Sequence, residues 1–288
     1  MHNNSIQQLS GFGSLAGLPC YQLNANGATV VVSAYGAQVL SYQNAAGREL
    51  LWLSQKAKWQ NNNAIRGGVP ICWPWFGKAA AEFGPEAAIL PNHGLVRTAF
   101  WQMTQQHISA EAVSISFIIE LAKLPWSHKT AKDNKPVRLI YQVTLSDVLE
   151  LQLSCDSLMM QQAALHSYFQ VAQAEGAVVS PLPLKCYDKV SNSTLQLNEA
   201  QLHFQGEIDR VYPDTARTLT LSLANSTTPQ LTIAQHGHDA SVLWNPGHPK
   251  AGAMADMHLG AAGEFVCIES ARLALEAKPL SLTQIIRG

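Results

Sequence analysis

Two residues of this sequence have the chemistry of an acid–base pair. His166 lies in the strand-like run Ala164-Leu-His-Ser-Tyr-Phe169, and histidine is the natural proton donor near neutral pH. Glu269 follows the apolar run Phe265–Ile268, and alternation places it on the face that carries Phe265 and Cys267. A carboxylate on such a face is costly unless it is hydrogen-bonded or functional. Two structural alternatives stay open: a core histidine with satisfied hydrogen bonds, and a strand-end glutamate that has turned into solvent.

Two loop-like segments carry arginines that could bind an anion. Ile65–Gly77 holds three glycines, two prolines and three large aromatic residues, so it fits neither a regular strand nor a helix. Arg66 stands at its entrance, and a guanidinium offers forked donors that suit phosphate. Pro91–Arg97 adds Arg97 as a second phosphate clamp, and His93 as a residue that could bond a hydroxyl group. The alternatives are a structural Arg66 paired with a carboxylate and a surface ion pair at Arg97.

Further candidates for contact with a sugar are one acid and a group of aromatic residues. Asp209, in the run Gly206–Tyr212, could accept hydrogen bonds from sugar hydroxyls. It could also pair with other groups in an exposed loop. Trp73, Trp75 and Phe76 could present a flat face to a sugar ring, or they could pack in the core.

The sequence predicts neither a metal nor a cofactor. The run His236-Gly-His238-Asp239 could chelate a metal in a turn, but no third ligand beyond Asp239 is evident nearby. The glycines between Gly11 and Gly17 neither follow a strand nor open a helix, which argues against a dinucleotide site. We therefore expect side chains alone to carry the chemistry.

The elements that must position these residues are strands. Apolar and polar residues alternate with period two in several runs, as in antiparallel sheets with one buried face. The clearest are Val113–Phe117, Leu149–Leu153 and Thr218–Leu223. Val137–Leu145 and Leu149–Cys155 flank a short turn and predict a hairpin. Short helices are predicted at Ser54–Gln60 and Lys250–Met257.

These patterns predict an all-β fold. Strands do not alternate with long helices, which argues against a doubly wound fold, and roughly fifteen short strands suggest two large sheets packed face to face. The most linker-like stretch, Thr130–Pro136, is short enough to be a turn between strands. We expect residues 1–288 to form a single β-sandwich domain.

Composition bounds the class of protein and its partners. The chain has 288 residues, of which 47% are hydrophobic and 14% charged, with a formal net charge of -1. Such a balance offers no general attraction to nucleic acid or anionic membranes. Five scattered cysteines form neither a disulfide framework nor a zinc pattern, which fits a reducing compartment. With no secretory signal and no membrane-length apolar stretch, we expect a cytoplasmic protein, and nothing demands more than a monomer.

Six segments, taken together and in order, resemble the hexose-6-phosphate mutarotases, the glucose-6-phosphate 1-epimerase branch of the aldose 1-epimerase-like proteins. The resemblance covers most of the chain. Its segments are Arg66–Gly77, His93–Arg97, Leu165–Phe169, Gly206–Tyr212, then Val242–Pro246 with Lys250 and Met254–Asp256, and finally Val266–Glu269.

The resemblance implies a galactose-mutarotase-like β-sandwich (a supersandwich) with the site on its concave sheet. It implies His166 as the catalytic acid and Glu269 as the catalytic base. By the same resemblance, Arg66 and Arg97 would hold the 6-phosphate of a hexose 6-phosphate, and Asp209 would bind sugar hydroxyls.

Two positions depart from the family pattern. Asn92 precedes His93 where some members carry a longer glutamine, which puts its contact with the substrate in question. Gly247 follows Asn245-Pro246 where an aromatic residue is common, so we expect a more open pocket wall.

The mechanism also fits the residue types. Opening a cyclic hemiacetal requires a base for the C1 hydroxyl and an acid for the ring oxygen, and no redox cofactor or metal is needed. The open aldehyde rotates about C1–C2 and closes as the other anomer. Three alternatives remain: an aldose 1-epimerase acting on unphosphorylated sugars, a non-catalytic sugar-phosphate-binding module, and a structural sandwich without a ligand.

Overall fold

The computed structural model describes residues 4–121, 124, 136–223, 226 and 230–288. This part of the chain folds into three antiparallel sheets. The smallest has the order β1-β2-β3-β4, with β1 (Ser5–Phe12), β2 (Leu15–Ala25), β3 (Ala28–Ser33) and β4 (Val39–Gln43). No helix in the described ranges is long and apolar enough to cross a membrane.

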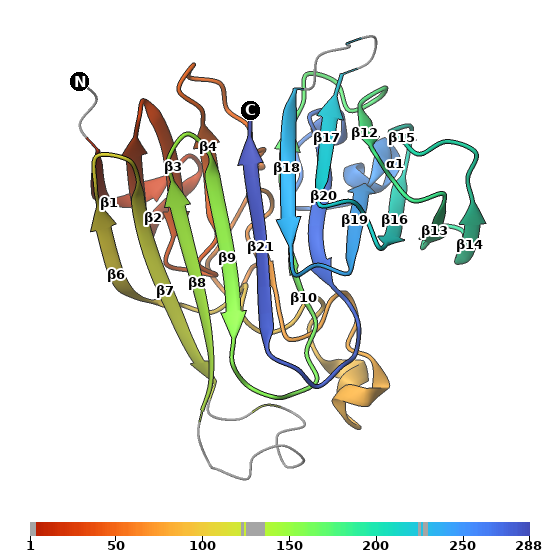
Figure 1. The fold of residues 1–288 in the computed structure, drawn as a ribbon, viewed down its shortest axis with the longest axis horizontal. Coiled ribbons are helices and arrows are strands. Elements are labelled where there is room, and N and C mark those ends of the chain that lie inside the picture. The colour runs from red at the N-terminus through yellow and green to blue at the C-terminus, as the bar shows by residue number, and fades with distance from the viewer. Residues whose placement is uncertain (1–3, 122–123, 125–135, 224–225, 227–229) are drawn as a thin grey trace.

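The nine-stranded sheet forms the front layer in Figure 1. Its order is β15 (Leu202–His203), β12 (Val178–Ser180), β17 (Thr218–Ser222), β18 (Leu231–His236), β21 (Leu280–Arg287), β9 (Leu149–Cys155), β8 (Val137–Leu145), β7 (Val113–Leu121) and β6 (Gln102–Ile108).

The eight-stranded sheet lies behind the β17–β18–β21 side of this layer (Figure 1). Its order is β14 (Ser193–Gln196), β13 (Lys185–Asp188), β16 (Ile208–Pro213), β19 (Ala240–Asn245), β20 (Phe265–Arg272), β10 (Ala163–Leu165) and β5 (Ile71–Cys72). The eighth strand, β11 (Tyr168–Gln170), also pairs with β20.

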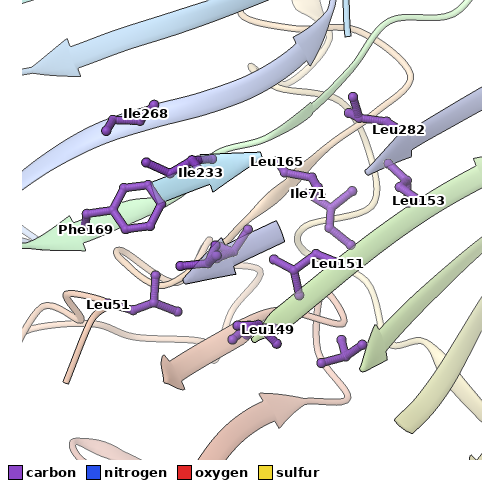
Figure 2. Close-up of a cluster of buried hydrophobic side chains, with 14 of the residues drawn as sticks. Leu51, Ile71, Leu149, Leu151, Leu153, Leu165, Phe169, Ile233, Ile268 and Leu282 are labelled. Carbon is purple, nitrogen blue, oxygen red and sulfur yellow. The ribbon is translucent and has the colours of Figure 1, made fainter. Parts of the chain in front are cut away.

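The two large sheets meet in one apolar layer. Figure 2 shows side chains of β9, β18 and β21 facing those of β10, β11 and β20. The labelled members from these strands are Leu149, Leu151, Leu153, Ile233, Leu282, Leu165, Phe169 and Ile268. The same cluster of buried residues extends from Leu23 to Ile286 and draws on all three sheets. This continuity supports a single domain over residues 1–288, which stays a prediction.

The all-β prediction is confirmed, and the predicted hairpin is β8–β9 with the predicted bounds. The window Ser54–Gln60 is not a helix, so that prediction is wrong. The Ser54 hydroxyl accepts the Lys56 N–H at 3.1 Å and donates to the Asp256 carbonyl at 2.6 Å, which ties this segment into a turn.

The second predicted helix is displaced, because α1 spans Gly247–Gly252 and not Lys250–Met257. The Asn245 side-chain oxygen accepts the Gly247 N–H at 2.8 Å and so starts the helix early. Of the predicted turn at Thr130–Pro136, only Pro136 lies in the described part of the chain.

The turn that joins β18 to β19 lies very close to the backbone of β21. Gly237 has φ +72°, and a Cβ there would lie 1.8 Å from the Ser281 carbonyl oxygen. Gly47 has a similar φ of +76° but nothing within 4 Å of the added atom. We expect Gly47→Ala to cost roughly 1–2 kcal/mol of unfolding free energy from backbone strain alone. Gly237→Ala should cost about 1–3 kcal/mol more, because the backbone must shift.

Urea unfolding of both variants beside the native protein measures this difference. Equal losses of unfolding free energy in the two variants would contradict the described contact between this turn and β21.

Candidate active site

The register of β20 brings His166 and Glu269 together. β10 pairs Leu165 with Ser270, and β11 pairs Tyr168 with Cys267. The same register, carried through the break between β10 and β11, sets His166 opposite Glu269. Directly opposed residues of antiparallel strands point to the same face. His166 Nε2 lies 3.4 Å from Glu269 Oε1.

The same face continues across the sheet as the floor of a cavity. Val242 lies opposite Glu269, and Trp244 lies opposite both Cys267 and Asp209. The cavity has a volume of about 740 Å³. Its lining is Arg66, Phe76, Gly77, Lys78, Asn92, His93, Arg97, Gln162, His166, Lys189, Asp209, Val211, Val242, Trp244, Lys250, Met254, Glu269 and Leu273.

All seven residues that the sequence predicted as site residues line this cavity. They are Arg66, Asn92, His93, Arg97, His166, Asp209 and Glu269. Phe76 also lines it, whereas Trp73 and Trp75 are fully buried core residues. Lys189 and Trp244 also line the cavity, and no sequence pattern singles out either as a site residue. Both follow from the register of β13, β16 and β19 once Asp209 is placed, but sequence alone does not give that register.

The His166–Glu269 pair is almost removed from solvent, with 7% of His166 and 1% of Glu269 exposed. Glu269 lies inside β20 and does not turn into solvent as a strand-end acid would. Within the described chain, His166 Nδ1 and Glu269 Oε2 are buried and have no hydrogen-bond partner.

Burial sets the electrostatics of this pair. Loss of water lowers the pKa of His166 well below its usual value, and His93, Arg66 and Arg97 lower it further. Burial likewise raises the pKa of Glu269 well above its usual value, although Lys189 opposes the shift. Desolvation therefore favours the uncharged forms of both groups and makes each, when charged, a more reactive acid or base.

His93 is held as a neutral hydrogen-bond donor beside this pair. Its backbone has φ +64°, and its N–H donates to the Gly77 carbonyl at 2.7 Å. The Gly77 N–H in turn donates to His93 Nδ1 at 3.3 Å. Burial and the positive charge of Arg97 and Lys189 lower the pKa of His93 to about 3. With Nδ1 accepting, Nε2 carries the proton of the neutral ring.

The two arginines differ in what already holds them. Arg66 Nε lies 2.9 Å from Asp256 Oδ2, and its Nη1 donates to the Tyr168 hydroxyl at 3.0 Å. Arg66 is therefore paired with a carboxylate, as in the structural alternative given for it above. Among the residues that the structure describes, Arg97 has neither an ion pair nor a side-chain hydrogen bond. Its surface ion-pair alternative is wrong, and Arg97 offers the cavity an open guanidinium.

Asp209 lies in β16 and faces the cavity, so the alternative of an exposed loop is wrong. Lys189 Nζ lies 3.5 Å from Asp209 Oδ1 and 4.7 Å from the centre of the Phe76 ring. Burial raises the pKa of Asp209, which Lys189 opposes. Arg210, one residue along, points to the other face and binds Asp188 at 2.9 Å.

The His236–Asp239 run has structural contacts. His238 Nε2 lies 3.2 Å from the Thr215 carbonyl oxygen, and the Asp239 carboxylate accepts the N–H groups of Leu273 and Ala274. Across the described ranges, no three histidine, cysteine, aspartate or glutamate side chains gather in a way that could hold a metal ion.

The sequence model of the aldose 1-epimerase family matches residues 19–277. The chain belongs to the aldose 1-epimerase family. Membership makes it an isomerase of the epimerase, or mutarotase, type that acts on a small sugar.

Individual relatives of this epimerase are also named as epimerases. The chain is 32% identical over 264 residues to a protein of Escherichia coli (strain K12) named "Putative glucose-6-phosphate 1-epimerase", with 88% of this chain and 84% of that protein covered. It is 31% identical over 262 residues to a protein of the same name from Salmonella typhimurium (87% and 84% covered).

Solved structures share the fold. YeaD of Salmonella typhimurium, described as a "putative mutarotase", superposes with a TM-score of 0.82 at 29% identity, covering 99% of this chain and 92% of that one. Galactose 1-epimerase of Lactobacillus acidophilus superposes with a TM-score of 0.70 at 13% identity (100% and 98% covered). The predicted galactose-mutarotase-like fold is therefore confirmed.

Asn92 and Gly247, the two departures from the family pattern, lie in different places relative to the cavity. Asn92 is exposed and lines the cavity, so it keeps access to a ligand. Gly247 does not line the cavity but starts α1 with φ +66°, and a Cβ there would lie 2.9 Å from the Glu207 nitrogen. A more open pocket wall at Gly247 stays a prediction, although this residue is not among those that line the cavity.

The neutral state of His93 in this epimerase can be measured. With a pKa of about 3 against an ordinary 6.5, the folded protein binds this proton later than the unfolded chain as pH falls. The stability linked to His93 is complete above pH 6.5 and declines as pH falls toward 3. In ¹H–¹⁵N spectra of the imidazole groups, we expect His93 to remain neutral from about pH 8 to about pH 5.

The variant His93→Asn assigns the resonance, since asparagine tolerates a positive φ. A protonation midpoint of His93 between those two pH values would contradict the described burial.

Proposed function

We propose that this epimerase interconverts the α and β anomers of a hexose 6-phosphate, with glucose 6-phosphate as the first substrate to test. One observation carries the proposal: a buried histidine–carboxylate pair 3.4 Å apart shares its cavity with the unpaired guanidinium of Arg97. The names of the curated relatives support the same substrate.

Anomer exchange requires an acid and a base side by side. The C1 hydroxyl and the ring oxygen are bonded to the same carbon, so the groups that serve them must be neighbours. Glu269 accepts the proton of the C1 hydroxyl while His166 donates a proton to the ring oxygen. The bond between C1 and the ring oxygen breaks, and C1 becomes a carbonyl carbon.

The reverse reaction uses the same two groups. After ring opening, Glu269 holds a proton and His166 is neutral, which are the forms that burial favours. Rotation about C1–C2 presents the other face of the carbonyl. His166 then takes the proton of the former ring oxygen as that oxygen attacks C1, and Glu269 returns its proton to the carbonyl oxygen. No oxidation state changes, so the reaction needs no redox cofactor, and the two side chains supply the acid and the base without a metal.

The remaining polar residues of the cavity hold the sugar phosphate. Arg97 has an open guanidinium for the 6-phosphate, and Arg66 adds positive charge from its fixed position. His93, Asp209 and Asn92 bind sugar hydroxyls. Binding at the phosphate fixes the orientation of the reacting end. A monomer located in the cytoplasm, without nucleic-acid or membrane partners, completes the proposal.

The first test is anomer exchange of glucose 6-phosphate, measured by NMR saturation transfer. Native protein should accelerate exchange, and Glu269→Gln and His166→Ala should each lower the rate by at least about 10²-fold, because each removes one proton-transfer group. The same measurement with unphosphorylated glucose is the control for substrate class.

The alternatives predict different results. Comparable exchange of glucose and glucose 6-phosphate would favour an aldose 1-epimerase of free sugars. Binding of glucose 6-phosphate without exchange above the spontaneous rate would favour a non-catalytic module and overturn the proposal.

A second test concerns the phosphate. Arg97→Met should raise the KM for glucose 6-phosphate roughly 10- to 100-fold with little change in kcat, because it removes charge-assisted hydrogen bonds remote from C1. The matched control is Arg210→Met, whose guanidinium binds Asp188 outside the cavity and should leave KM unchanged. An unchanged KM in Arg97→Met would place the phosphate elsewhere.

A further inference from the structure

A cluster of polar side chains interrupts the apolar layer between the two large sheets. Gln235 in β18 and Gln284 in β21 lie opposite each other in the nine-stranded sheet. Ser241 in β19 and Ser270 in β20 lie opposite each other in the eight-stranded sheet. With Ser167, all of these residues are completely buried. The alternate positions on the same strands carry apolar core residues, among them Ile233, Ile268 and Leu282, which Figure 2 labels.

These side chains form a continuous chain of hydrogen bonds. The Ser167 hydroxyl donates to Gln284 Oε1, and Gln284 Nε2 donates to the Ser270 hydroxyl oxygen at 2.9 Å. The Ser270 hydroxyl donates to Gln235 Oε1 at 2.9 Å, and Gln235 Nε2 donates to Ser241 Oγ at 2.9 Å. Within the described chain, none of their side-chain nitrogen or oxygen atoms is left buried without a partner.

The cluster lies directly behind the acid–base pair. Ser167 follows His166 and Ser270 follows Glu269, so each serine points to the core face where its neighbour points to the cavity. Through Gln284, the two serines are bound to each other across the pair. The Gln284 side chain thus bridges Ser167 and Ser270. The residues that precede these two serines, His166 and Glu269, lie 3.4 Å apart.

The hydrogen-bond chain lies at a break in the strand that carries His166. The strand is interrupted at His166 and Ser167, between β10 and β11. There the Ser167 N–H donates to the Leu165 carbonyl at 3.1 Å, a local turn and not a sheet bond. The His166 N–H donates to the Pro70 carbonyl at 3.0 Å and the Ile268 N–H donates to the Ser167 carbonyl at 3.1 Å. The segment is thus tied on both sides but lacks the regular strand pairing that Glu269 has inside β20.

We propose that the buried Ser167–Gln284–Ser270 hydrogen-bond chain is a positioning device that holds His166 in register with Glu269. Stability alone does not call for it, because well-packed apolar side chains in a core are often as stable as a satisfied polar network. Catalysis does call for it, since small displacements of a reacting group have large effects on rate.

The test compares buried serines inside and outside this chain, and its kinetic part rests on the proposed mutarotase function. Ser167→Ala and Ser270→Ala each remove one link. Ser33→Ala is the matched control, because Ser33 is also completely buried and donates one hydrogen bond, to the Tyr35 carbonyl, away from the cavity. Ser270→Ala also serves if Ser167→Ala does not fold.

We expect similar losses of unfolding free energy in the three variants. In anomer exchange of glucose 6-phosphate, kcat should fall on the order of 10- to 100-fold in Ser167→Ala and Ser270→Ala, with KM nearly unchanged. Ser33→Ala should keep the native kcat. If kcat in the two network variants equals that of Ser33→Ala, the positioning role is overturned.

A second readout needs no substrate. The ¹⁵N shifts of the His166 imidazole, which faces Glu269, His93 and Tyr168, should move in ligand-free Ser167→Ala and stay native in Ser33→Ala. Unchanged shifts in Ser167→Ala would overturn the positioning role even if the enzyme is active. If the native protein does not exchange the anomers, the proposed function is overturned. The ¹⁵N shifts of His166 would then be the only test of the positioning role.

Discussion

The register between β20 and the interrupted pair β10–β11 is the constraint on which this site depends. Because side chains alternate, one register decides at once that His166 and Glu269 face the cavity and that Ser167 and Ile268 face the core. A slip of one residue would exchange the two sets and bury the acid–base pair among leucines. The apolar layer between the sheets strongly opposes such a slip, so core packing and site geometry have a common cause.

The division of the site into a floor and a rim follows from this constraint. Strands provide the floor, where the proposed proton transfer would be sensitive to small errors in position. Loops provide Arg66 and Arg97 at the rim, where the proposed function would place the phosphate. The loops are nevertheless closely fitted, since a Cβ at Gly94 would lie 1.9 Å from the Trp73 carbonyl oxygen. That contact fixes the His93 loop against the loop that begins at Arg66.

Sequence reasoning located the parts of this arrangement that depend on local pattern. It found the all-β class and the β8–β9 hairpin, and it chose Glu269 because a carboxylate on an apolar face is unusual. It missed Lys189, which reaches the cavity only through the pairing of β13 with β16. It also overlooked Gln284, because a glutamine in an alternating strand resembles a solvent-facing residue. Pairing between distant strands is the information that one sequence lacks.

Arg66 illustrates how the fixed and open parts of the site are coupled. Its guanidinium binds Asp256 and the Tyr168 hydroxyl, and the Tyr168 ring stacks on His166 with centroids 4.9 Å apart and an interplanar angle of 11°. An arginine so engaged has few donors left for a phosphate, but its charge still disfavours protonation of His166 and lowers the pKa of that group. Arg66 is therefore coupled to both parts of the site: its positive charge faces the same cavity as Arg97, and its hydrogen bond to Tyr168 fixes the ring against which the His166 imidazole packs.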